Sequence, residues 1–117
     1  MNVVILRGKL TRTPEERVFD SGTRLVRYDV SIRSEEHGTE NAPVVWFDPP
    51  SRATQCKSGD EVVVVGRVRR RWFRSGGASE SRIEVVATDV VPTRQAKRAN
   101  AAIERVLAAA EASAPPA

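Results

Sequence analysis

The sequence predicts a mainly β protein, a small closed barrel of five strands followed by a C-terminal helix. Three observations support this fold class. Five runs of β-branched or alternating residues lie within residues 1–92, and each is bounded by glycine, proline or a polar turn. The fourth run contains a glycine, where a barrel strand can bend. After residue 92 the composition changes, and ten of the last 24 residues are alanine.

The first two strands are predicted from β-branched content and alternation. A β-branched run over 2–10 forms the first strand, and residues 13–16 (Thr-Pro-Glu-Glu) are expected to turn the chain. After a Ser-Gly turn, residues 23–33 alternate with period two, which is typical of a strand with one buried face. Tyr28 shares its face with valine and isoleucine side chains, so we expect it in the core.

The third strand is short in this prediction. Residues 34–42 are polar and contain a glycine, which indicates a loop, and residues 43–47 form the strand. An Asp-Pro-Pro sequence ends the strand, because proline cannot continue a ladder of hydrogen bonds. Residues 51–57 are predicted to form a helical turn capped by Ser51.

A long hairpin completes the barrel. The fourth strand covers 61–73 with a bulge or bend at Gly66, residues 74–82 form the hairpin tip, and the last strand runs over 83–92. Five strands with a short helical insert before the fourth are typical of the OB-fold. A sandwich would need about seven strands.

The chain is therefore divided into a barrel domain over 1–92, an alanine-rich helix over 93–113 and a disordered end over 114–117. An isolated helix of this length is marginal in water, so we expect its apolar stripe to pack against a protein surface. The stripe consists of Ala99, Ile103, Val106, Leu107 and Ala110.

Several classes of protein are excluded. With 117 residues there is room for one domain, and no apolar run is long enough to span a membrane. The start of the chain does not resemble a secretory signal, so a cytoplasmic location is expected. Only one cysteine (Cys56) and one histidine (His37) are present, which argues against disulfides and a usual zinc site. No catalytic or cofactor motif occurs, so we expect neither an enzyme nor a cofactor.

Charge points to a nucleic acid. The net charge is +4, and sixteen of the 19 cationic residues are arginine. Arginine binds phosphate through a planar fork and stacks on flat rings. A GC-rich genome would explain the same excess, so the placement of the arginines is more informative than their number.

The strongest local signal lies in residues 67–74, which contain five arginines, two aromatic residues and no acid. Cations that follow phosphates, beside rings on which bases stack, are typical of proteins that bind single strands without sequence preference. Alternation predicts Arg69, Arg71 and Phe73 on one side of this strand. Arg70 and Trp72 fall on the other side.

Two further sets of residues extend this candidate surface. Trp46 and Phe47 are adjacent in the third strand, so alternation sends one inward and one outward. Arg7 and Lys9 share the polar face of the first strand, as part of a basic track or as an ordinary solvated face. The candidate nucleic-acid-binding residues are Arg7, Lys9, Trp46, Phe47, Arg67, Arg69, Arg70, Arg71, Trp72, Phe73 and Arg74.

Short motifs recur in order along residues 1–92. They consist of Asn2, Val4, Leu6, Gly8 and Leu10; Pro14, Glu15 and Arg17; Ser21 to Thr23; Tyr28; Val44, Val45 and Phe47; Lys57 to Asp60; Val62 to Arg69; and Glu84 to Ala87. In their order and spacing these motifs resemble those of the bacterial single-stranded DNA-binding protein family.

The resemblance implies an OB-fold homotetramer that wraps single-stranded DNA without sequence preference in replication, repair or recombination. Phe47 takes the place of the family's stacking phenylalanine. The family's stacking tryptophan on the hairpin arm corresponds to Phe73, with Trp72 one residue away. The family's other stacking tryptophan has no counterpart, because residues 40–43 are Glu-Asn-Ala-Pro.

The chain also departs from the family. Residues 48–57 are shorter than its helical insert, and the family's acidic C-terminal tip is replaced by an alanine-rich segment. The resemblance therefore implies a short or accessory form, with no recruitment of repair proteins through an acidic tip. Two alternatives stay open: an RNA-binding OB module, and a protein-interaction OB subunit that has lost DNA binding.

Overall fold

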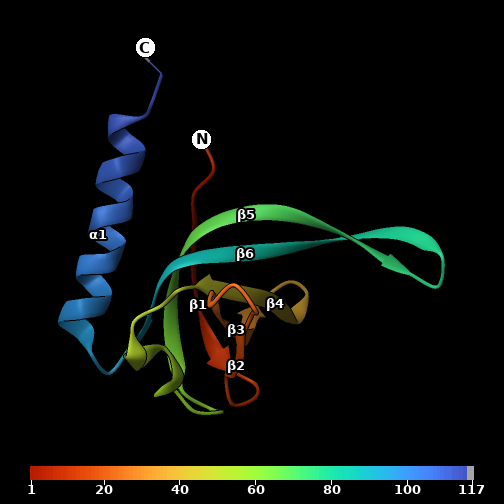
Figure 1. The fold of residues 1–117 in the computed structure, drawn as a ribbon. Helices are drawn as coiled ribbons and strands as arrows, with labels where there is room; N and C mark the ends of the chain where they lie inside the picture. The colour runs from red at the N-terminus through yellow and green to blue at the C-terminus, as the bar shows by residue number, and fades with distance from the viewer. Residues whose placement is uncertain (116–117) are drawn as a thin grey trace.

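The computed structural model describes residues 1–115 of the chain (Figure 1). The elements are β1 (Val4–Leu10), β2 (Glu15–Val18), β3 (Arg24–Ser34), β4 (Gly38–Phe47), the 3₁₀ helix η1 (Ser51–Thr54), β5 (Glu61–Ser75), β6 (Ala78–Pro92) and α1 (Ala96–Ala112).

Five of the strands close into a barrel, which confirms the predicted OB-fold. The sheet order is β1-β5-β6-β4-β3-β2, and β1 also pairs with β3, which closes the ring. β4 and β6 run parallel through the pairs Val44–Val85 and Val45–Val86, while the other pairs of neighbouring strands run antiparallel. β2 pairs with β3 and adds a short sixth strand outside the ring.

The barrel interior is filled by one face of each strand. Tyr28 is 1% exposed, as predicted for the core, and its hydroxyl donates a hydrogen bond of 2.7 Å to the carbonyl oxygen of Ala53. Burial raises the pKa of Tyr28 above its usual range, so the phenol stays neutral. The largest fully buried side chains in the cluster with Tyr28 are Leu10, Val26, Val30, Val44, Val62, Val64 and Val90.

Gly66 bends β5 where the strand leaves the barrel. The register of β5 against β6 shifts between Val65 and Gly66, which confirms the predicted bulge. A Cβ atom at position 66 would collide with the carbonyl oxygen of Val86. Only glycine permits this close approach of the two backbones.

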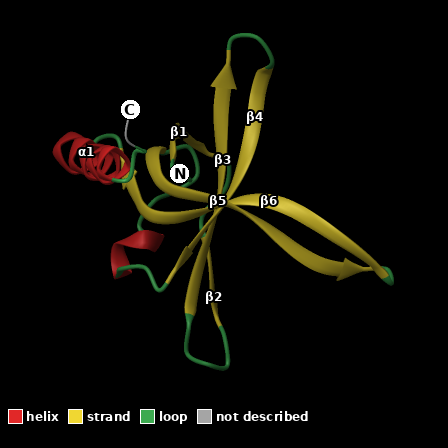
Figure 2. Ribbon diagram, turned by 90° about the horizontal axis from the view of Figure 1, so that it is seen from above, coloured by secondary structure: helices red, strands yellow, loops and turns green. Residues whose placement is uncertain are grey.

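Two segments predicted as a turn and a loop belong partly to strands. The expected turn over 13–16 overlaps β2, which pairs along its length with β3. The expected loop over 34–42 turns only at residues 35–37, and its last five residues begin β4. The hairpins of β2–β3 and β3–β4 project away from the barrel (Figure 2). Both faces of a projecting strand carry polar side chains, so its sequence lacks the apolar–polar alternation that predicts a strand.

The tip of the β5–β6 hairpin is also shorter than predicted. Residues 74–82 are mostly strand, and the turn consists of Gly76 and Gly77, whose φ angles are 58° and 84°. Two glycines with positive φ allow a two-residue turn that matches the strand twist.

The helical turn η1 is shorter than expected as well. Ser51 is not its cap, because Pro50 occupies the cap position without a side-chain hydrogen bond.

Helix α1 packs on the outer face of its own barrel. Ala99 and Ala102 are buried against Val63, Val65 and Val91 of β5 and β6. This confirms the predicted packing, with part-buried Ile103 and Val106 completing the contact, whereas Leu107 is 47% exposed. No helix in residues 1–115 is long and apolar enough to cross a membrane. The disordered end predicted over 114–117 lies partly outside the described residues.

Candidate nucleic-acid interface

The β5–β6 hairpin extends beyond the barrel as an arm, here defined as residues 67–84 (Figures 1 and 2). β1 pairs with β5 only as far as Gly66, and β4 pairs with β6 only at Val85 and Val86. Within the described residues, the two arm strands therefore pair only with each other. Both faces of the arm can contact solvent or a ligand.

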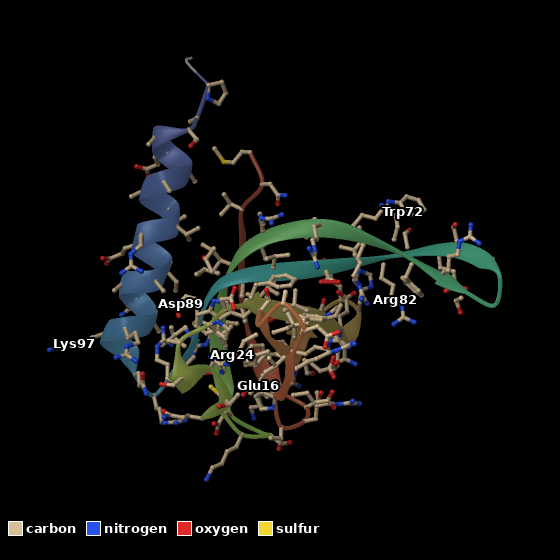
Figure 3. All side chains as sticks on the ribbon, viewed as in Figure 1. Glu16, Arg24, Trp72, Arg82, Asp89 and Lys97 are labelled. Carbon is tan, nitrogen blue, oxygen red and sulfur yellow. The ribbon has the colours of Figure 1, made fainter. Side chains whose placement is uncertain are left out.

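The two faces of the arm carry different residues. Arg69 and Arg71 lie opposite Glu84 and Arg82 in the register, on the face that continues the outside of the barrel. Trp72 lies on the other face, and Figure 3 shows Trp72 and Arg82 pointing to opposite sides of the arm. This confirms the predicted alternation. The face of β5 that continues the outside of the barrel carries Arg67, Arg69, Arg71 and Phe73, and the opposite face carries Arg70, Trp72 and Arg74.

A groove of about 250 Å³ lies between the arm and the outer face of the barrel. Its lining residues are Arg12, Glu15, Arg27, Asp29, Pro43, Val45, Arg71, Arg82 and Glu84. Arg12 is paired with Asp29 at 3.0 Å. Arg27 and Arg82 have no acidic partner within residues 1–115, so they are the groove's free cations.

Sequence reasoning missed Arg12, Arg27 and Arg82. Each stands alone in its segment, and only the fold brings the three together. The period-two alternation of β3 was the one available signal, because it places Arg27 opposite the buried face.

Two aromatic rings lie on this same outer surface, and guanidinium groups cover both. Phe47 packs beside Leu25, Val45 and Val86, and the Arg69 guanidinium lies 5.1 Å from its ring centroid. The guanidiniums of Arg71 and Arg82 lie 5.6 Å and 5.1 Å from the ring centroid of Phe73. Such cation–π contacts hold the arginine side chains against the rings.

A buried acid connects the arm arginines. Glu84 is 4% exposed, and its Oε2 and Oε1 atoms accept contacts from Arg69 Nη2 at 3.2 Å and from Arg71 Nε at 2.9 Å. Sequence reasoning did not single out this residue as part of the surface. Glu84 lies within a run of β-branched residues, and nothing in that run predicts that arginines of the neighbouring strand will bury its side chain.

Three predicted residues lie elsewhere. Trp46 is only 6% exposed and belongs to the barrel core, so it offers no ring face to a base and is removed from the candidate surface. The inward side chains of β4 are Val44 and Trp46, which leaves Phe47 as the outward aromatic residue. Arg7 and Lys9 lie on β1, outside the groove lining, and Arg7 forms an ion pair of 2.9 Å with Glu61.

The described residues contain no group of three metal-ligating side chains. Cys56 is 3% exposed, and burial raises the pKa of its thiol, with the nearby Asp60 acting in the same direction. The thiol is therefore an inert part of the core. His37 is exposed in the β3–β4 turn, 3.7 Å from Glu36.

A family model described as the single-strand binding protein family matches residues 1–93. The chain is 31% identical over 103 residues to the single-stranded DNA-binding protein of Thermus aquaticus, covering 80% of this chain and 39% of that protein. It is 31% identical over 99 residues to the protein of the same name from Oceanobacillus iheyensis, covering 77% of this chain and 62% of that protein.

Solved structures give the same result. The wild-type single-stranded DNA-binding protein from Thermus aquaticus matches with a TM-score of 0.65 and 27% identity, over 79% of this chain and 40% of that chain. A Plasmodium falciparum SSB in complex with single-stranded DNA matches with a TM-score of 0.68 over 79% of this chain and 94% of that one. At 15% identity, the latter match shows a shared fold.

Proposed function

This chain belongs to the single-strand binding protein family, and we propose that it binds single-stranded DNA without sequence preference. One observation carries the proposal. Two outward-facing rings, Phe47 and Phe73, lie on one continuous surface with the unpaired cations Arg27 and Arg82. Because the chain spans 39% of the length of the Thermus relative, its activity is inferred from its own residues as well as from the family.

The surface suits a strand whose bases are free. Each ring, together with the guanidinium that lies against it, forms a flat stack to which any base can add, and stacking contributes about 1–3 kcal/mol per base regardless of its identity. Arg27 and Arg82, together with Arg67 on the same face of the arm, supply positive charge for the phosphates. Duplex bases are stacked inside the helix, so a duplex would use the cations alone.

Fluorescence anisotropy tests this function. A labelled oligo(dT), a duplex and an RNA of equal length are titrated across a salt series. We expect the highest affinity for oligo(dT), with log K falling by about 0.7 per phosphate contact for each log unit of salt. Equal affinity for duplex and single strand would contradict the proposal, and preference for the RNA would support the RNA-binding alternative.

We also propose a homotetramer. The support is the family resemblance, together with exposed apolar side chains on β1 and α1, namely Ile5 at 38% and Leu107 at 47%. Light scattering at micromolar concentration is expected to give four times 12.9 kDa. A monomer mass under these conditions would contradict it.

We place this activity in replication, repair or recombination, in the cytoplasm at the nucleoid. The protein would act there without catalysis, by covering exposed single strands. Protection of a bound oligomer from a single-strand nuclease is the corresponding assay, and digestion at the rate of the free oligomer would count against this role.

A further inference from the structure

We propose that Glu84 is a positioning residue that makes the groove selective for single strands. On this proposal, Glu84 holds two arginines against the aromatic rings instead of leaving them free to bind phosphates. The inference rests on the proposed function and deepens it, because it concerns how the same surface distinguishes single strands from duplex.

The geometry of Glu84 is unusual for a surface that binds a polyanion. Its side chain is 5% exposed, and both carboxylate oxygens are occupied by arginines of the neighbouring strand. Arg69 and Arg71 share one face of β5 and would repel each other without the carboxylate between them.

The carboxylate fixes where these two guanidiniums lie. Arg69 lies over Phe47 at 5.1 Å, and its Nε atom is buried with no hydrogen-bond partner among the described residues. Arg71 lies over Phe73 at 5.6 Å. Each guanidinium is thus held at a ring by one carboxylate oxygen, and a planar guanidinium is itself a surface on which a base can stack.

The charge of Glu84 acts against phosphate binding. Arg69, Glu84 and Arg71 together carry a net charge of about +1 instead of the +2 of the arginines alone. This lowers attraction to any polyanion, duplex DNA and heparin included. A single strand recovers the loss because its bases can stack on the two guanidinium planes, whereas the bases of a duplex are already stacked inside the helix.

The test compares two variants that each remove one negative charge from the same face of β6. Glu84→Gln releases the two arginines, while Glu80→Gln alters an exposed acid opposite Phe73 in the register. Binding of oligo(dT), an equally long duplex and heparin is measured for both variants and for the wild type.

For Glu84→Gln we expect the preference for oligo(dT) over duplex to fall about ten-fold, within the range for losing one stacked base. Affinity for duplex and heparin is expected to rise, with the duplex salt slope steeper by about 0.9 for each arginine released. Glu80→Gln is expected to strengthen binding of all three polymers alike and to leave the preference unchanged.

A preference that is unchanged in Glu84→Gln, or that falls equally in Glu80→Gln, would overturn the proposal.

Arg71→Lys gives a second test, which remains available if the Glu84→Gln variant does not fold. This substitution keeps the positive charge but loses the planar fork. It is expected to lose oligo(dT) affinity without gaining duplex affinity, and wild-type binding of oligo(dT) by this variant would also overturn the proposal. A wild type without single-strand preference would overturn both this proposal and the proposed function.

Discussion

Phe73 and Trp72 are neighbours in the chain, yet their surroundings differ. Phe73 is half-buried on the groove side under two guanidiniums, whereas Trp72 is 68% exposed on the opposite face of the arm. The larger ring is therefore the one outside the groove. Exposure alone would select Trp72 as the stacking residue, but Phe73 is the ring in contact with Arg71 and Arg82, which line the groove.

We predict that Phe73→Ala weakens binding of oligo(dT) by about 1–3 kcal/mol, because a base loses its stacking partner. Trp72→Ala is the matched control and should change the affinity by less than about two-fold, since its ring faces away from the groove. Anisotropy at low salt measures both variants. An equal loss in Trp72→Ala would show that both faces of the arm bind DNA.

At this scale, alternation predicts which residues share a face, but for the arm and for the end of β4 it does not indicate which face is buried. Alternation correctly grouped Phe73 with Arg69 and Arg71. For the adjacent residues Trp46 and Phe47, alternation required that one side chain face inward but did not indicate which. Trp46 pairs with the buried Val26 of β3, so Trp46 is the inward residue. The burial of Glu84 depends on arginines from another strand, so local sequence contains no trace of it.

Among the strands, the parts within the barrel follow the sequence closely and the parts that project from it do not. β3 matches its predicted strand to within one residue at each end, because one face is buried along most of its length. β4 and β6 each begin five residues before their predicted starts, in segments with mostly polar side chains. These strands are extended by backbone hydrogen bonds to the adjacent strand, and the residue types in the segment do not reveal such bonds.

Helix α1 provides a test of packing between elements. We predict that Ile103→Asp lowers the free energy of unfolding by about 2 kcal/mol, because it puts a charge against Val63 and Val65. Leu107→Asp is the control on the same helix, where the side chain is half exposed, and should cost no more than about 0.5 kcal/mol. Thermal unfolding followed by circular dichroism gives both values. Equal effects would mean that the helix does not use this stripe.

At the scale of the whole molecule, three carboxyl groups connect stability to pH. A hydrogen bond from Arg24 lowers the pKa of Glu16, and one from the backbone N–H of Lys57 lowers that of Asp60. Hydrogen bonds from Arg7 and then Thr93 lower the pKa of Glu61. These contacts join β1, β2, β3, β5 and the segment that leads into α1.

When the pKa of a carboxyl group is lower in the folded chain than in the unfolded chain, its ionised form stabilises the fold. This contribution is complete above the unfolded pKa and is lost as the pH falls through the folded pKa. We therefore predict constant stability from neutral pH down to about pH 5 and a decline below about pH 4. Urea unfolding at a series of pH values measures this. Glu61→Gln should flatten the decline, whereas Glu35→Gln, in an exposed turn, should leave it unchanged. A decline that is equally steep in both variants would show that Glu61 has no part in it.

The closed ring of strands has a consequence for how copies of this chain avoid one another. Free strand edges are templates for aggregation, and closure leaves them mainly on β2, along the arm and at the projecting end of the β3–β4 hairpin. β2 is four residues long and carries three charged side chains, and residues 67–74 of β5 carry five arginines. Charged side chains on an open edge discourage another strand from pairing there. The arginines proposed to contact DNA thus also keep the arms of crowded molecules apart. Removing several of them would weaken DNA binding and would also make the arm more prone to pair with a strand of another molecule.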